Sequence, residues 1–194
     1  MAIVTIRNAR LAFPDLFEPV QFQGSGPFNW RCTFLIDPEN PAKAAIEAAF
    51  KQVAAEKWGA KAQQFLPSIL SAPNKCCLSD GNLKAYNGFA GNWAITATRA
   101  QDFTKKNANA PEIVDRNRSV LTGIEGKIYA GAFVNGTVDI WAQDNSYGKG
   151  LRATLINVQY VKNGDSFGGS APATSSNLED LSFEDDDEGG IDSI

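Results

Sequence analysis

The chain has 194 residues, of which 43% are hydrophobic and 21% are charged, with 18 Lys and Arg against 22 Asp and Glu. These values are typical of one globular domain, with or without a tail. The absence of His excludes Ser-His-Asp and Cys-His nucleophile systems and an imidazole general base. The three Cys residues suit neither a disulfide framework nor a zinc knuckle. No apolar run is long enough to span a membrane, so we expect a cytoplasmic protein without a membrane partner.

The negative charge is concentrated at the C-terminus. Residues 178–194 contain eight acidic residues and no Lys or Arg, so residues 1–177 carry a net charge of +4 and the last segment −8. Residues 163–177 are rich in Gly, Ser, Ala and Pro, which is typical of a flexible linker. The sequence therefore predicts a folded domain over residues 1–162, a flexible linker over 163–177 and a disordered acidic tail over 178–194.

Two interpretations of the acidic tail stay open. The tail could serve solubility alone, or it could act as a tethered polyanion that competes with another polyanion for a basic groove. Apolar residues among the acids favour a docking peptide, because solubility does not require them. We expect the tail's partner contacts to include Phe183, Asp185, Asp186, Asp187 and Ile194.

The N-terminal part of the chain predicts two strands. Residues 2–13 are rich in β-formers, and Pro14 and Asp15 are expected to end this strand. Residues 21–27 contain two glycines and are expected to form a mobile loop. The next strand, residues 29–36, alternates with a period of two. One face carries Trp30, Cys32, Phe34 and Ile36, and the other carries Arg31, Thr33 and Leu35.

One helix is predicted with clear boundaries, from residue 41 to residue 57. Asn40 is the expected N-cap, and Pro41 suits the first helical position. The apolar stripe consists of Ile46, Ala49, Phe50, Val53 and Ala54. A short second helical piece is expected over residues 60–65, ended by Pro67.

The remainder of the domain is predicted to be β structure. Strands are expected at residues 92–100, 124–141 and 151–161, with Gly131 and Gly136 as bulge or bend positions. Bent strands, one main helix and long loops indicate a mostly β domain. A Greek-key β-barrel of the OB fold accounts for these elements most economically. An open α+β sheet remains an alternative.

The sequence predicts no catalytic site. Its carboxylates are scattered over turns and strand ends, and no D-x-D, E-x-x-H or EF-hand pattern occurs. The segments around Gly24 and Gly88 lack the Lys and Ser or Thr of a phosphate-binding loop. We therefore expect no catalytic residue, no metal and no cofactor.

Interleaved cations and aromatic rings predict binding of single-stranded nucleic acid. Such binding needs cations along the phosphates and ring faces for the bases, each stacked base contributing about 1–3 kcal/mol. Tyr86 and Tyr147 lie in Gly- and Asn-rich turns, where core packing is less natural than in a strand. The expected stacking and clamping residues are Trp30, Arg31, Tyr86, Phe89 and Tyr147. The expected phosphate contacts are Lys84, Arg99, Lys105, Lys106, Arg116, Arg118, Lys149 and Arg152.

A series of short segments resembles a known family. The segments occur in order at residues 79–81, 86–89, 111–116, 128–131, 141–145, 148–150 and 157–159. Together with the tail, they resemble the tailed-phage single-stranded DNA-binding proteins, which share an OB fold and an acidic C-terminal tail. The similarity covers about Ile3 to Gly164. It implies sequence-independent protection of single-stranded DNA during phage replication and recombination in the infected host cell. It also implies a tail that contacts replication proteins and occupies the DNA groove when DNA is absent.

Two other functions remain as alternatives. One is a structural or scaffold component of a virion, in which the β domain assembles and the tail keeps it soluble. The other is a nuclease or a different DNA-processing enzyme, which would need clustered carboxylates that the sequence pattern does not predict. The sequence leaves a homo-oligomer open.

Overall fold

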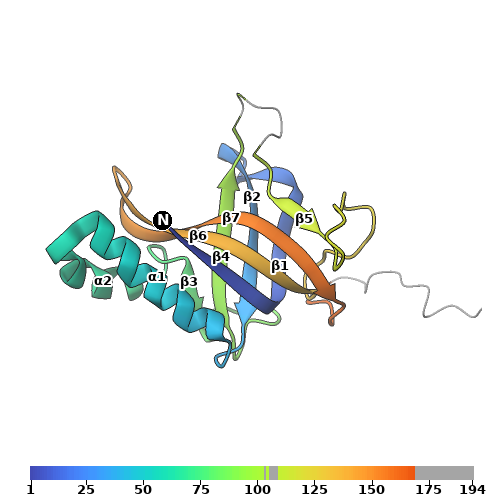
Figure 1. The fold of residues 1–194 in the computed structure, drawn as a ribbon, viewed down its shortest axis with the longest axis horizontal. Helices are drawn as coiled ribbons and strands as arrows, with labels where there is room; N and C mark the ends of the chain where they lie inside the picture. Colours follow the sequence, from blue (N-terminus) through green and yellow to red (C-terminus); the bar gives the residue numbers. More distant parts are fainter. Residues whose placement is uncertain (103, 105–108, 169–194) are drawn as a thin grey trace, which may run out of the picture.

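The computed structural model describes residues 1–102, 104 and 109–168 (Figure 1). Within them the fold is mostly β with one main helix, as the sequence predicts. The strands are β1 (Ala2–Phe22), β2 (Ser25–Ile36), β3 (Leu78–Asp80), β4 (Trp93–Ala100), β5 (Glu112–Val114), β6 (Phe133–Asn145) and β7 (Gly148–Lys162). The acidic tail, most of the predicted linker, Lys105 and Lys106 lie outside the described residues.

The strands form a barrel. Their order in the sheet is β3-β4-β2-β1-β6-β7-β5, and a parallel pairing of β4 with β7 at Thr98 and Thr154 closes the circle β1-β2-β4-β7-β6. This is the five-stranded Greek-key barrel of the OB fold. The open α+β sheet is therefore excluded. Strand β5, which the sequence analysis did not predict, extends the sheet beyond β7.

Strand β1 is much longer than predicted. Its first half pairs with β6 and its second half with β2, so one strand serves both sides of the barrel. Pro14 and Asp15 do not end it, because the register shifts between Ala12 and Asp15. Proline is tolerated at such a bulge, since no ladder hydrogen bond is required of it there. Phe13 adopts a positive φ of 48° at this bulge.

The expected loop over residues 21–27 is instead a tight hairpin. Phe22 pairs with Ser25, and the two residues between them, Gln23 and Gly24, have φ values of 51° and 72°. Two successive positive φ values are the signature of the type I′ turn, whose twist matches that of the flanking strands. Strand β2 therefore begins four residues earlier than the sequence pattern indicated.

The barrel interior confirms the alternation predicted for β2. Trp30, Cys32, Phe34 and Ile36 are all buried inside. Gly136 on β6 lies opposite the Phe34 ring, which a Cβ atom at that position would overlap. Close packing of this large ring thus explains the glycine in the strand.

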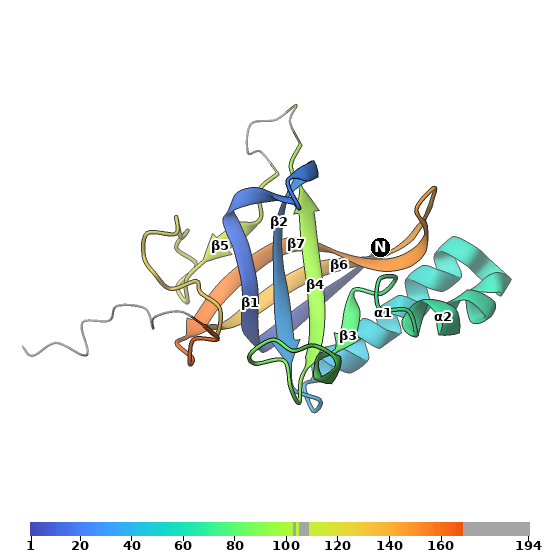
Figure 2. The same cartoon turned by 180° about the vertical axis from the view of Figure 1, so that it is seen from behind.

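Two helices lie together beside one end of the barrel (Figures 1 and 2). Helix α1 (Pro41–Trp58) begins as predicted, with Asn40 Oδ1 accepting a hydrogen bond of 3.0 Å from the Ala42 N–H. Its predicted apolar stripe is buried. Helix α2 (Ala62–Leu70) follows a 3₁₀ turn and continues past Pro67, which corrects its expected end. Pro67 loses its own N–H bond, but its carbonyl accepts from Ser71 and completes the last turn.

Other predicted boundaries differ moderately. Residues 124–132 form a connection, and only the part of the expected strand from Phe133 onward is β structure. Residues 163–168, assigned to the linker from composition, contact the barrel; for example, Gly164 and the Tyr129 hydroxyl exchange hydrogen bonds. In the described part of the chain, neither helix has the length and apolar character needed to cross a membrane.

Candidate nucleic-acid interface

A groove runs along the outer face of β2 and β4, strands that lie toward the viewer in Figure 2. It consists of two hollows of about 570 and 290 Å³ that share Lys84 and Thr96. We call their union the groove. Its cations are Arg31, Lys84 and Arg152, and among the described residues no acid lines it.

The strand register builds the floor of the groove. Arg31 pairs with Thr98 and Thr33 pairs with Thr96, so all four side chains point outward from the barrel. The hydroxyls of Thr33 and Thr96 lie 3.1 Å apart. Further along the same face, Leu35 and Ala94 are covered by the segment that precedes β4, because Phe89 packs on them. One half of this face is therefore closed and the other half open.

Three aromatic rings stand at one end of the groove. The Tyr86 ring lies 5.0 Å from that of Phe13 and 5.3 Å from that of Phe89, both in edge-to-face geometry. Tyr86 is 55% exposed and Phe13 is 47% exposed. Two rings thus present free surface to the groove, and Phe89 supports them from below.

The groove cations are held differently. Arg31 Nε donates to Asp15 Oδ2 at 2.6 Å, so part of its charge is balanced by that acid. Arg152 donates to the Gln143 side chain at 3.0 Å and to the Asn74 carbonyl at 3.1 Å, which orients its guanidinium. Lys84 is exposed, and no carboxylate of the described residues forms an ion pair with it. It is the most available cation of the three.

Two predicted stacking residues are buried and do not offer a ring face. Trp30 is 1% exposed inside the barrel, and Phe89 is 2% exposed beneath Tyr86. The expectation that these rings stack on bases is corrected, because a base can stack only on an accessible ring. Each ring was a candidate on chemistry alone, which does not distinguish core from surface.

Arg99 is also corrected as a phosphate contact. It follows Thr98 on β4 and therefore points to the opposite side of the strand from the groove. Its guanidinium donates to the backbone carbonyls of Asn109 and Leu155. These bonds hold the segment after β4 against β7, a structural role.

Other predicted cations lie away from the groove. Lys149 forms a 2.6 Å ion pair with Asp144 and lies over the Phe65 ring near the helices. Arg116 and Arg118 lie in the turn after β5, on another side of the barrel. Tyr147 is 91% exposed at the tip of the β6–β7 hairpin.

A second polar hollow, of about 300 Å³, lies against β1, β5, β6 and β7; we call it the β5–β7 pocket. Arg7 and Arg118 line it, together with Glu112 and amide side chains such as Asn135 and Gln159. No aromatic ring is part of its described lining. It offers positive charge without a stacking surface.

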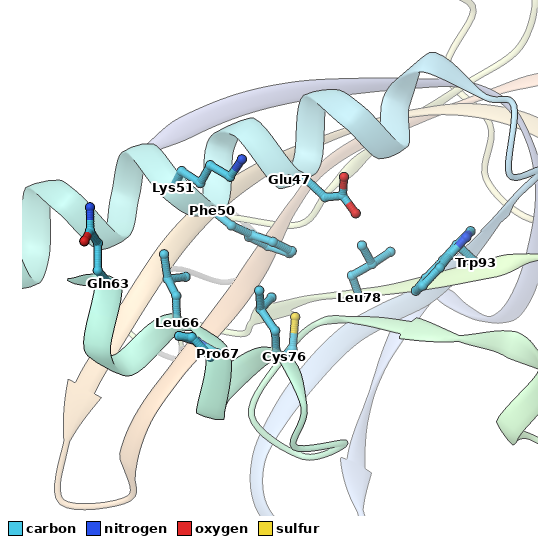
Figure 3. Close-up of a pocket in the computed structure, with 10 residues that line it drawn as sticks. Glu47, Phe50, Lys51, Gln63, Leu66, Pro67, Cys76, Leu78 and Trp93 are labelled. Atoms are coloured by element: carbon cyan, nitrogen blue, oxygen red, sulfur yellow. The ribbon is translucent and has the colours of Figure 1, made fainter. Parts of the chain in front are cut away.

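The largest of these cavities, about 650 Å³, lies between α1, α2 and β3 (Figure 3). Phe50, Leu66, Leu78 and Trp93 make its lining mainly apolar. Its chemistry suits apolar side chains better than a phosphate backbone, so it is not the candidate DNA surface.

The groove also contains residues that sequence reasoning missed. Phe13 was assigned to the end of a strand, and its exposure follows from the bulge at Pro14. Thr33 was assigned to the same face of its strand as Arg31, but neither it nor Thr96 and Thr98 was predicted to line a groove. Period-two alternation identified their face, whereas only the closed barrel reveals which part of it stays open.

Two cysteines border the groove, and the hydrogen bond with Cys77 lowers the pKa of the Cys76 thiol. Cys76 and Cys77 are buried along its edge. The hydrogen bond with Cys76 and burial together raise the pKa of Cys77, which keeps it a neutral thiol. Within the described residues, no cluster of three or more Cys, Asp or Glu side chains could hold a metal ion.

Comparison with known proteins identifies the family of this chain. A family model described as the ssDNA-binding protein of Enterobacter phage Enc34 matches residues 1–189. Putative protein p50 of Acyrthosiphon pisum secondary endosymbiont phage 1 is 40% identical over 187 residues, which are 95% of this chain and 97% of that protein.

Solved structures share the fold. The single-stranded DNA-binding protein of bacteriophage Enc34, in complex with ssDNA, matches with a TM-score of 0.70 at 22% identity, over 86% of this chain and 90% of that one. The single-stranded DNA-binding protein gp2.5 of bacteriophage T7 matches with a TM-score of 0.60 at 12% identity, over 90% and 99% of the two chains. On the strength of the family match over nearly its whole length, this chain belongs to the phage ssDNA-binding protein family represented by that of Enterobacter phage Enc34.

Proposed function

We propose that the groove on β2 and β4 binds single-stranded DNA without sequence preference. Phosphates lie against Arg31, Lys84 and Arg152, and bases stack on Phe13 and Tyr86. The observation that carries the proposal is the combination of three cations and two exposed rings in two adjoining hollows whose described lining contains no acid. Single-strand binding needs this combination, because cations hold the backbone and ring faces hold unpaired bases.

Sequence independence follows from the donors in the groove. The hydroxyls of Thr33, Thr96 and Thr98 suit phosphate and sugar oxygens, which every nucleotide presents. Stacking is likewise tolerant of base identity, since every base has a π face. A duplex would be bound less well, because its paired bases are already stacked on one another.

In this proposal, three further predicted contacts extend the DNA path beyond the groove. Tyr147 at the tip of the β6–β7 hairpin would meet nucleotides that leave one end. Lys105 and Lys106, outside the described residues, would meet phosphates near the segment that follows β4. These three contacts stay predictions.

The acidic tail, residues 178–194, acts in this proposal as a competitor of DNA. Gly168, the last described residue, lies beside the aromatic end of the groove, where it helps to line an adjoining hollow. A polyanion tethered there has a local concentration on the order of millimolar at the cations. DNA displaces it, and the displaced tail contacts replication proteins through Phe183, Asp185, Asp186, Asp187 and Ile194.

The biological role follows from these properties. The protein covers single-stranded DNA during phage replication and recombination in the cytoplasm of the infected host cell. Covering and releasing a strand needs binding alone, so we propose that the protein is not an enzyme and uses no cofactor.

A mobility-shift titration tests the proposal. Single-stranded oligonucleotides should bind more tightly than duplexes, and the affinity should fall with salt by about 0.7 in log–log slope for each phosphate neutralised. Removing residues 178–194 should raise the affinity. Affinity independent of salt, or a preference for duplex, would contradict the proposal. Unchanged or weaker binding after truncation would contradict the competing tail alone.

A further inference from the structure

Residues 165–168, which we call the strap, fold back onto the aromatic end of the groove. The Phe167 N–H donates to the Ala130 carbonyl at 3.0 Å, and Asn87 Nδ2 donates to the Phe167 carbonyl at 2.6 Å. The Phe167 ring and the rings of Phe13 and Tyr86 line one hollow of about 350 Å³, which adjoins the groove. The strap therefore closes one end of the proposed DNA path.

Arg10 lies beneath the strap. Its guanidinium lies 4.8 Å from the centre of the Phe133 ring and 4.6 Å from that of Phe167. Its Nε donates to the Gly131 carbonyl at 2.7 Å, and its Nη2 donates to the Asp165 carbonyl at 2.6 Å. Half of the partners of this cation thus belong to the strap.

The absence of a side chain at Gly88 lets the Phe167 ring pack directly against the backbone. A Cβ atom at Gly88, which has a φ of 82°, would overlap this ring. The ring also packs against the small cluster around Phe89 that supports Tyr86. The Phe167 ring consequently packs against the Arg10 guanidinium and against the backbone at Gly88.

The groups under the strap are those that bind a nucleotide. Arg10 offers a cation and a flat stacking surface, and Asn87 offers amide donors. The strap presents an aromatic ring where a base would stack, and carbonyl oxygens where phosphate oxygens would accept. We infer that the strap covers one further nucleotide subsite of the groove, which single-stranded DNA enters by displacing Phe167. This inference rests on the proposed DNA-binding function.

Few contacts hold the strap in place, so an incoming nucleotide can displace it. Three hydrogen bonds and one half-buried ring attach it, and every group that it uses is one that a nucleotide can satisfy in exchange. Segments with so few buried contacts belong to the least stable parts of a fold. Entry of DNA would also release Gly168, the last described residue before the rest of the predicted linker and the acidic tail.

The test uses the full chain and a series of dT oligonucleotides of increasing length. Phe167→Ala should bind long oligonucleotides about 5- to 10-fold more tightly than the wild type, because no ring competes with the base. The shortest oligonucleotides should show no difference. Phe167→Tyr keeps the ring and should behave as the wild type. Arg10→Ala should remove the gain when combined with Phe167→Ala.

Further variants separate the alternatives. Phe65→Ala removes a half-buried ring near the helices, so it should lower the melting temperature without changing DNA affinity. Phe167→Leu, which keeps apolar packing, serves if Phe167→Ala folds poorly, and should show a smaller gain.

Equal binding by Phe167→Ala and wild type at every length would overturn the inference. A gain at all lengths would do so as well, since it would indicate a loosened tail. Absence of any DNA binding by the wild type would instead refute the proposed function.

Discussion

The groove and the β5–β7 pocket both carry cations, but they differ in whether exposed aromatic rings lie beside those cations. The groove combines Arg31, Lys84 and Arg152 with exposed rings, and no described acid lines it. The β5–β7 pocket has two arginines but also Glu112, and its described lining contains no ring. Both would attract a phosphate, but only the groove can also hold an unpaired base.

The difference indicates which property a search for such sites should use. Cations are spread over the whole barrel, and several of them serve the fold, as Arg99 and Lys149 do. A stacking surface is rarer, because most rings are buried to form the core. Exposed rings next to unpaired cations are therefore the more specific signal.

The largest expected effect compares equal charge removal from the two hollows. Lys84→Ala combined with Arg152→Ala should weaken binding of single-stranded DNA about 10- to 100-fold at low salt, since charged hydrogen bonds to phosphate are lost. The salt slope should become shallower by about 1.4. The matched double variant is Arg7→Ala with Arg118→Ala, which should leave affinity and slope unchanged. Salt titrations of the wild type and of both double variants measure the affinity and the salt slope. Equal losses of affinity in both double variants would show that net charge alone governs binding.

A smaller effect is expected from the ring of Tyr86. Tyr86→Ala should reduce the affinity about 5- to 20-fold, because one stacked base is lost, while the salt slope stays as in the wild type. Tyr86→Phe keeps the ring and should retain full affinity. Fluorescence-anisotropy titrations at two salt concentrations measure both quantities. A loss for Tyr86→Phe equal to that for Tyr86→Ala would assign the effect to the hydroxyl instead.

The smallest effect concerns the pH dependence of stability at Asp115, in the turn after β5. Backbone N–H groups of Ser119 and Asn117 donate to Asp115, and together with the nearby Lys127 they lower the pKa of this carboxyl. A lowered folded-state pKa stabilises the fold above the unfolded value of about 3.9, and this contribution disappears as the pH falls through the folded value.

Asp115→Ala should therefore melt at a lower temperature than the wild type near neutral pH. The difference between the two proteins should shrink as the pH falls from about 4 through the lowered pKa of the folded carboxyl, where the wild-type side chain becomes protonated. Thermal melts across this pH range measure it. DNA affinity near neutral pH should not change, because Asp115 does not line the groove. A weaker DNA affinity for this variant would show that the turn after β5 takes part in DNA binding.

Strand β2 illustrates how far sequence patterns predict the site. The alternation correctly placed Trp30, Cys32 and Phe34 on one face of the strand and Arg31 and Thr33 on the other, and the structure shows that the first face points into the barrel. The chemistry of single side chains was less informative, because Trp30 was expected to stack on DNA and is instead buried. Periodicity reports burial directly, whereas residue type reports only what a side chain could do once exposed.

The aromatic end of the groove could not have been predicted in the same way. Phe13 lies on a strand that the sequence pattern ended too early, and Tyr86 lies in a turn more than seventy residues later. Their rings meet because the bulge at Pro14 lets β1 continue along β2. No local pattern records a contact between segments so far apart.

The sequence by itself determined the division into a basic domain and an acidic tail, the main helix, most strands and the family. These depend on composition and on periods of a few residues, which are local properties. Only the tertiary structure decided which of many cations share a hollow with exposed rings, and that residues 165–168 close its end. Barrel closure brings these cations together, because the pairing of β4 with β7 places Arg152 beside the face that carries Arg31 and Lys84.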